Sequence, residues 1–160
     1  MVKRLSIVLF VLINISCDQL SKDYVRNYVE PLDYIQIVND NLILTNIENT
    51  GAMLGFGQEF SPTVKMIFLQ GLPLLILFIL LARVLFKTNL NRWMVLAFAF
   101  VIGGGMGNLI DRIIYGSVTD FFQIKFGVIR TGIFNMADVS VTTGVLILLF
   151  LVFRYRNLSI

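Results

Sequence analysis

The chain contains no histidine and a single cysteine, Cys17, among its 160 residues. Without histidine, the usual zinc sites and the Ser-His and Cys-His nucleophile systems are excluded. A lone cysteine also excludes an internal disulfide framework. Carboxylates therefore remain as the side chains best suited to acid–base chemistry.

Charge is scarce as well, since 14% of the residues are charged and 57% are hydrophobic. A soluble domain is about half apolar and about a quarter charged. The net charge of +3 does not indicate nucleic-acid binding, because the cations lie in short stretches between apolar segments. Length and composition predict one integral membrane domain over 1–160 that is mainly α-helical.

Apolar runs predict four membrane-spanning helices, at about 5–21, 65–85, 93–111 and 133–154. A helix needs ~20 residues to cross the hydrocarbon, with a range of ~17–25. The first run is the shortest of the four. Its length alone leaves its assignment open.

The N-terminal run also has features of a lipoprotein signal peptide: a basic start, an apolar core and Cys17 after a small residue. Such signals favour leucine three residues before the cysteine, where this chain has Asn14. Asp18 and Lys22 are four residues apart with the acid first, which stabilises a helix. We therefore expect the helix to continue past Cys17 as a retained first span.

The distribution of charge predicts the topology. With four spans, the side that holds both termini carries cations and no acid, and all ten acids lie at or near the other side. Short basic flanks mark the cytoplasmic side, so both termini are expected in the cytoplasm. The cations of this side are Lys3, Arg4, Arg83, Lys87, Arg92, Arg154 and Arg156.

The outer loop at about 30–60 is rich in β-forming residues. Partly alternating runs at 34–38 and 42–47 flank a turn at 39–41, which predicts a small antiparallel sheet on the outer membrane surface. The shorter second outer loop contains VTDFFQI, 118–124, which is expected to form a strand or a re-entrant stretch.

The third span ends with the sequence GGGMGNLIDR. Gly103 and Gly107 form a small-xxx-small pair that lets another helix come close. Asn108, Asp111 and Arg112 are spaced to share one helix face. They form either a helix end with an internal ion pair or part of a functional site.

Asp138 lies about five residues inside the fourth predicted span, or ~7 Å from its start. A carboxylate within a span costs at least ~2.5–3.5 kcal/mol and normally marks a site. A charge favoured by the helix dipole is the alternative, but the predicted depth favours a site.

Two acids held close together share one proton, because both cannot ionise easily. The ionised acid takes a proton from water and the protonated one polarises a peptide carbonyl. Spacing leaves two pairs open, Asp120 with Asp138 or Asp111 with Asp138.

Several motifs, in order along most of the chain, resemble those of lipoprotein signal peptidase (signal peptidase II), a family of bacterial membrane aspartic endopeptidases. They are DQLSK (18–22), NTGAMLGFG (49–57), GGGMGNLIDR (103–112), GSVTDFF (116–122) and FNMADVS (134–140). The resemblance implies four transmembrane helices, cytoplasmic termini, and an outer β-sheet that cradles the substrate.

The resemblance also implies that Asp120 and Asp138 are the catalytic dyad, near the outer face. The residues expected to bind substrate or support the dyad are Asp18, Lys22, Asn49, Gly51, Gly104, Gly107, Asn108, Asp111, Arg112, Asn135 and Ala137. One departure is Met53-Leu54, where the family often has Ala-Phe. This difference affects packing on the substrate side rather than the catalytic residues.

The substrate implied is a prolipoprotein whose cysteine already carries diacylglycerol, with cleavage just before that cysteine. The family requires no metal or other cofactor, and globomycin-type antibiotics inhibit it. The expected location is the bacterial cytoplasmic (inner) membrane, in contact with lipid, as a monomer without a nucleic-acid partner. We further expect the glycines of 103–107 to leave room for a signal helix or for a neighbouring span.

Two other classes fit some of these features. A small transporter or proton-relay protein would use Asp111 and Asp138 to carry charge, but the chain lacks an evident repeat with broken helices. A non-catalytic assembly factor would use the glycine-rich face for docking, and would tolerate Asp120→Asn and Asp138→Asn.

Overall fold

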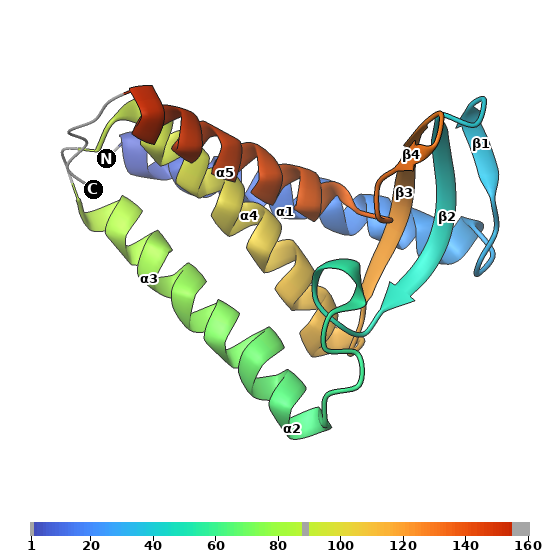
Figure 1. The fold of residues 1–160 in the computed structure, drawn as a ribbon. Helices are drawn as coiled ribbons and strands as arrows, with labels where there is room; N and C mark the ends of the chain where they lie inside the picture. Colours follow the sequence, from blue (N-terminus) through green and yellow to red (C-terminus); the bar gives the residue numbers. More distant parts are fainter. Residues whose placement is uncertain (1, 88–89, 155–160) are drawn as a thin grey trace.

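The computed structural model describes residues 2–87 and 90–154 and shows a helical bundle with a small sheet at one end (Figure 1). Arg156 and the side chain of Lys3, which entered the topology prediction, lie outside the described part of the chain.

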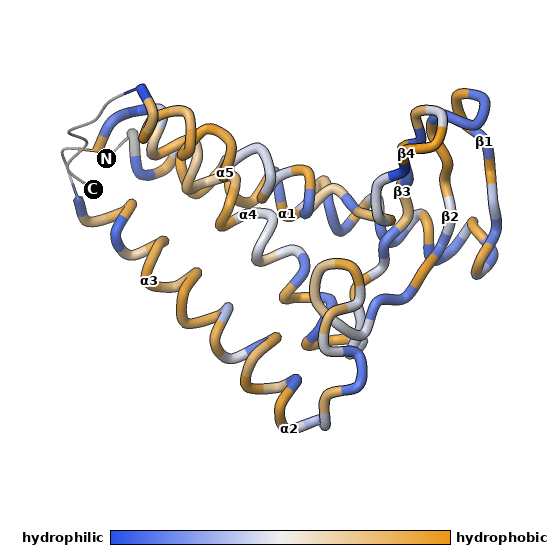
Figure 2. Tube along the Cα trace, viewed as in Figure 1, coloured by the Kyte–Doolittle hydropathy of each residue, from blue (hydrophilic) through white to orange (hydrophobic). Residues whose placement is uncertain are grey.

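The helices of the bundle are α1 (Val2–Tyr28), α2 (Pro62–Lys65), α3 (Leu72–Phe86), α4 (Arg92–Ile114) and α5 (Met136–Arg154). A π-helical segment, Met66–Gly71, joins α2 to α3. Within the described residues, four helical stretches are long and apolar enough to cross a membrane: Arg4–Tyr28, Pro62–Phe86, Arg92–Ile114 and Met136–Arg154. Hydrophobic residues dominate these stretches (Figure 2), and α1 begins where α5 ends (Figure 1). The four-span prediction is confirmed.

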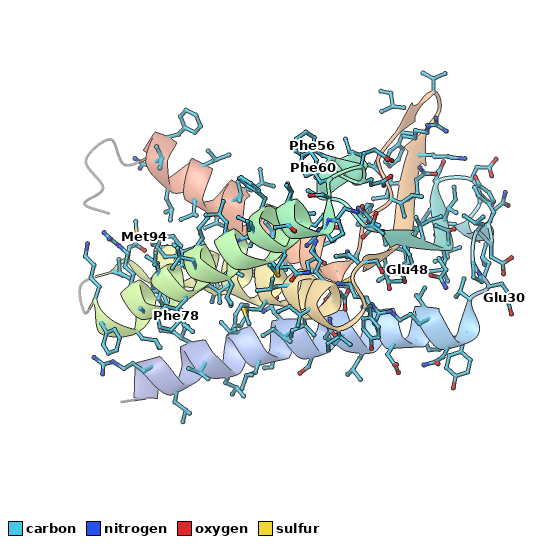
Figure 3. All side chains as sticks on the ribbon, turned by 90° about the horizontal axis from the view of Figure 1, so that it is seen from below. Glu30, Glu48, Phe56, Phe60, Phe78 and Met94 are labelled. Atoms are coloured by element: carbon cyan, nitrogen blue, oxygen red, sulfur yellow. The ribbon has the colours of Figure 1, made fainter. Side chains whose placement is uncertain are left out.

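Helix α4 is central to the bundle and packs against α1, α3 and α5. Its run of glycines makes this possible, because each glycine faces a different neighbour. Gly103 faces α1, Gly104 faces α5 and Gly105 faces α3, and a methyl group at any of them would clash with that helix. The core of the bundle includes Phe98 and Ile102 of this helix, and Met94 lies far from the sheet end where Glu48 is found (Figure 3).

A four-stranded antiparallel sheet covers the end of the bundle that is far from Met94, and its strands lie in the order β1-β2-β3-β4. Its strands are β1 (Ile35–Val38), β2 (Leu42–Asn49), β3 (Val118–Phe126) and β4 (Ile129–Arg130). The predicted strands of the first outer loop are confirmed. The segment 118–124 forms a strand rather than a re-entrant stretch, so both outer loops contribute to one sheet.

Helix α1 extends beyond its predicted end at residue 21. Its last turn carries Val25, which forms a small core with Val29 and with Phe121 of β3. These side chains are almost fully buried, and the sheet therefore stabilises the extra turns. The helix passes through Cys17 without interruption, as predicted.

The fourth span begins later than predicted, at Met136 rather than near residue 133. Phe134 is extended because its backbone N–H and C=O pair with Phe122 of β3. Asp138 consequently lies in the first turn of α5. The prediction that it lies about five residues inside the span was wrong, and the argument from depth does not hold.

Candidate active site

Three side chains fix the first turn of α5 by hydrogen bonds. One belongs to the turn itself, one to the residue before it and one to α1. Asn135 Oδ1 accepts a hydrogen bond from Asp138 N at 2.9 Å, and Asp138 Oδ2 accepts one from Asn135 N at 3.2 Å. This reciprocal pair is a capping box built from Asn and Asp. Asp18 of α1 caps a further free amide, with 2.8 Å between its Oδ1 and Ala137 N. The carboxylate of Asp138 is thereby held at a helix N-terminus, where negative charge is favoured.

Asp120 reaches the same place from strand β3. Its Oδ2 accepts a hydrogen bond from Asn49 Nδ2 at 3.0 Å, and its Oδ1 accepts one from Asn135 Nδ2 at 2.6 Å. Asn49 ends β2 and pairs in register with Val118. The sheet therefore positions both Asp120 and one of its donors.

Asn135 links the two aspartates. Its side chain is fully buried, and its amide uses the oxygen for Asp138 N and the nitrogen for Asp120. Since the amide can present only one donor end and one acceptor end, its orientation is determined by these contacts. The capping residue of α5 thus sets how the sheet carboxyl and the helix carboxyl lie relative to each other.

Burial controls the protonation of Asp120, whose side chain is 6% exposed. Loss of solvent raises its pKa to about 6, and the nearby charge of Asp138 raises it too. The hydrogen bonds from Asn49 and Asn135, and the charge of Lys22, act in the opposite direction. A carboxyl group with this pKa can hold or release a proton near neutral pH.

The carboxylate of Asp138 accepts a second hydrogen bond, this one from α4, with 2.9 Å between Asn108 Nδ2 and Asp138 Oδ1. Both oxygens of Asp138 therefore act as acceptors, one toward Asn108 and one toward the backbone of Asn135. Asp138 is half-buried, whereas Asp120 is buried.

A pocket of about 850 Å³ adjoins both aspartates and is mainly apolar. It lies between α3, α4 and α5 on one side and the loop that follows β2 on the other. Residues along it include Pro73, Ile76, Leu77, Val101, Val139 and Val141. Pro73, Ile76 and Leu77 were not identified from the sequence, where they look like ordinary residues of a span. This volume is large enough for a lipid chain or an apolar peptide segment.

The loop that follows β2 closes part of this pocket. Arg112 Nη2 lies 2.9 Å from the carbonyl oxygen of Gly51, which ties the loop to the end of α4. Met53 and Leu54 line the pocket, and both are strongly exposed. Leu54 has a φ of 56°, in the left-handed region. Phe56 and Phe60 contact each other further along the loop (Figure 3), with ring centroids 5.7 Å apart.

Behind the aspartates lies a buried cluster of charges. Lys22 Nζ is 2.8 Å from each of Asp18 Oδ2 and Asp111 Oδ2. Arg26 Nη2 is 3.1 Å from Asp111 Oδ1. Asp111 thus pairs with α1, and the alternative of an internal ion pair with Arg112 was wrong.

Two predicted site glycines support the site from outside the pocket. A methyl group at Gly107 would lie 2.5 Å from Asp18 Oδ2, and one at Gly104 would collide with the carbonyl oxygen of Ala137. These glycines leave room for neighbouring spans, so the expectation that they make room for a signal helix is not supported at these two positions. Gly105, which lines the pocket, faces α3 instead.

Comparison with known proteins is consistent with this arrangement. The family model described as "Signal peptidase (SPase) II" matches residues 9–154. The chain belongs to the signal peptidase II family. Membership in this family supports a peptidase, in a protein with four membrane-capable helices.

Among curated proteins named "Lipoprotein signal peptidase", that of Pelodictyon phaeoclathratiforme is 36% identical over 148 residues, covering 87% of this chain and 85% of the relative. That of Streptococcus pneumoniae is 33% identical over 150 residues, covering 93% of each chain. A solved structure described as a bacterial membrane enzyme has a TM-score of 0.83 and 25% identity, covering 97% of this chain and 93% of its own.

Two residues of the buried charged cluster, Gln19 and Arg26, were not identified as site residues from the sequence. Gln19 donates from Nε2 to Asp111 Oδ1 at 3.0 Å, and Arg26 pairs with Asp111. A signal for Arg26 was present, because residues 18, 22 and 26 repeat every four positions and share a helix face. Gln19 lies within the DQLSK motif, but no role was assigned to it.

Proposed function

We propose that this chain is a membrane aspartic endopeptidase that removes the signal peptide from diacylglyceryl-modified prolipoproteins. The proposed cleavage is just before the lipidated cysteine. The observation that carries this proposal is the placement of Asp120 and Asp138, bridged by Asn135, beside a large apolar pocket.

In this proposal a water molecule lies between the two carboxyl groups. Asp138 removes a proton from the water while the water oxygen attacks the scissile carbonyl carbon. Asp120 gives its proton to the carbonyl oxygen. In the second step Asp138 delivers its new proton to the leaving nitrogen, while Asp120 recovers a proton from the tetrahedral intermediate. Both residues then return to their starting states.

The different surroundings of the two aspartates support these roles. Burial raises the pKa of Asp120 to about 6, which favours it as the holder of the shared proton. Asp138 accepts hydrogen bonds through both oxygens at the start of a helix, which suits a base. Low polarity around the pocket strengthens each of these interactions.

The pocket also supports a lipid-bearing substrate. Its walls from α3, α4 and α5 are mainly apolar, so an apolar signal helix and an acyl chain fit it better than a soluble peptide. We propose that the sheet cradles the polypeptide beyond the cysteine, that both termini lie in the cytoplasm, and that a globomycin-type inhibitor blocks the same pocket. We propose that the protein acts as a monomer without a metal.

The test uses purified protein in detergent with a prolipoprotein peptide carrying a diacylglyceryl cysteine, and a matched peptide with an unmodified cysteine. Mass spectrometry of the products identifies the cleaved bond. The expected result is one cut immediately before the lipidated cysteine, with little cleavage of the unmodified peptide. Absence of cleavage, or equal cleavage of both peptides, would contradict the proposal.

A further inference from the structure

Lys22 is the least expected feature of helix α1. Its side chain is completely buried, and burying an ammonium group is costly unless it is fully paired. Its ion pairs with Asp18 and Asp111 place two anions beside one cation, and Arg26 beside Asp111 supplies the second cation. These contacts connect α1 to α4, but they do not use the whole ammonium group.

The remaining contact of Lys22 points toward the dyad. Lys22 Nζ donates to Asn108 Oδ1 at 2.8 Å, and Asn108 Nδ2 donates to Asp138 Oδ1 at 2.9 Å. An ammonium group has only donors, so the end of the Asn108 amide that faces Lys22 must be its oxygen. The amide nitrogen is then forced to face Asp138.

We propose that Lys22 is a positioning residue of the peptidase reaction, acting through Asn108 to hold Asp138 as a hydrogen-bond acceptor in the orientation that water activation requires. This inference rests on the proposed function. With Lys22 absent, the Asn108 amide is free to turn over and present its oxygen to Asp138. The base would then lose a donor and face a second acceptor.

A purely structural role for Lys22 would arise from its ion pairs alone. A charge-balanced variant separates this structural role from the proposed positioning role. Lys22→Met combined with Asp111→Asn removes one cation and one anion, leaving Asp18 and Arg26. The relay through Asn108 is broken while the net charge of the cluster is kept. Lys65→Met, at the end of α2 and away from the cluster, serves as the matched lysine control.

The experiment measures kcat and KM for cleavage of a diacylglyceryl-modified prolipoprotein peptide by each variant in detergent. The charge-balanced variant is expected to lose about 10- to 100-fold in kcat, the scale of a lost hydrogen bond to a charged group. KM should stay unchanged, because the variant alters the base and not the pocket. Parental kcat in the charge-balanced variant would overturn the inference.

A double-mutant cycle tests whether the effect passes through Asn108. In an Asn108→Leu background, the charge-balanced change should cause no further loss of kcat. Equal losses in both backgrounds would show that Lys22 acts independently of Asn108, and the inference would fail. If the parent itself does not cleave the peptide, the proposed function fails instead.

Asn108→Asp gives a second route that leaves all charged partners of Lys22 in place. It keeps an oxygen for Lys22 but also presents an oxygen to Asp138. We expect its kcat to fall at least as far as that of Asn108→Leu, with thermal unfolding used to confirm the fold. Parental kcat for Asn108→Asp would contradict a requirement for donor orientation.

Discussion

Asp120 and Asp138 share Asn135 but differ in their surroundings. Asp120 lies on a strand and is buried, whereas Asp138 lies at a helix N-terminus and is half-buried. Burial disfavours the ionised form of Asp120 and raises its pKa to about 6. Below that pH Asp120 mostly carries a proton, and above it Asp120 is mostly ionised.

The first prediction concerns the pH dependence of cleavage. Because the proposed mechanism needs a proton on Asp120, kcat/KM should decline as pH rises through the pKa of this group in the free enzyme. A pH series of initial rates with the lipidated peptide measures the decline. A profile that keeps rising through this range would assign the proton donor elsewhere.

A second prediction separates the two kinds of neighbour of Asp120. Asn49→Ala removes a hydrogen bond that lowers the pKa of Asp120, so this pKa should rise. Asp138→Asn removes a negative charge that raises it, so the pKa should fall. Carbon-13 NMR titration of the Asp120 carboxyl in micelles measures both shifts, and shifts of the same sign in the two variants would contradict the account.

At the residue scale, part of the reasoning that singled out Asp138 from the sequence was wrong. Asp138 was singled out by its predicted depth, but it is a capping residue in the first turn of α5. The pattern Asn135-x-x-Asp138 is a capping signature that can be seen in the sequence. By contrast, the pairing of Asp111 with Lys22 depends on how α1 and α4 pack, and no local pattern predicts it.

Helix α4 is the element on which the site depends most. Asn108 contacts Asp138, Asp111 pairs with α1, and Arg112 holds the loop through Gly51. These contacts require close approach of α1 and α5, which the glycines of α4 permit. Gly107 is the tightest point for the charged cluster, since it lies directly against Asp18.

Gly107→Ala should therefore destabilise the protein by about 1–3 kcal/mol, the usual cost of overpacking a well-packed core. The matched control is Gly71→Ala, where the added methyl group would lie 3.5 Å from the carbonyl oxygen of Met66. Thermal unfolding in detergent should show a lower Tm for Gly107→Ala and no loss for Gly71→Ala. Equal Tm values in the two variants would contradict the packing role of Gly107.

The elements themselves were largely predictable. Apolar length gave the four spans, and β-branched alternation gave β1 and β2. The pairing of β2 with β3 was not predictable, because the two strands come from different loops and the helices between them in the chain must pack before the strands can meet. For the same reason the contact between Asn49 and Asp120 could not be derived from spacing.

For the whole molecule, the sheet and the start of α5 lie at one end of the bundle, and α1 begins and α5 ends at the other (Figure 1). Asp120 belongs to β3 and Asp138 to the first turn of α5. The acid-free flanks of the termini predict that this second end is cytoplasmic. A site at the outer end would meet a signal helix that enters sideways from the bilayer. Water would also be available there for hydrolysis.

Single-cysteine labelling tests this orientation in a Cys17→Ser background. Val128→Cys, fully exposed at the turn between β3 and β4, should react with a membrane-impermeant maleimide in intact spheroplasts. Lys87→Cys, between α3 and α4, should react only after permeabilisation. The reverse pattern would place the site on the cytoplasmic side.

The most direct test of the dyad is the kcat of Asp120→Asn and of Asp138→Asn on the lipidated peptide. Thermal unfolding should first establish that each variant is folded. Each should lose about 10²- to 10⁴-fold in kcat, the contribution of a positioned acid or base. Parental kcat in either folded variant would show that Asp120 and Asp138 are not the catalytic pair.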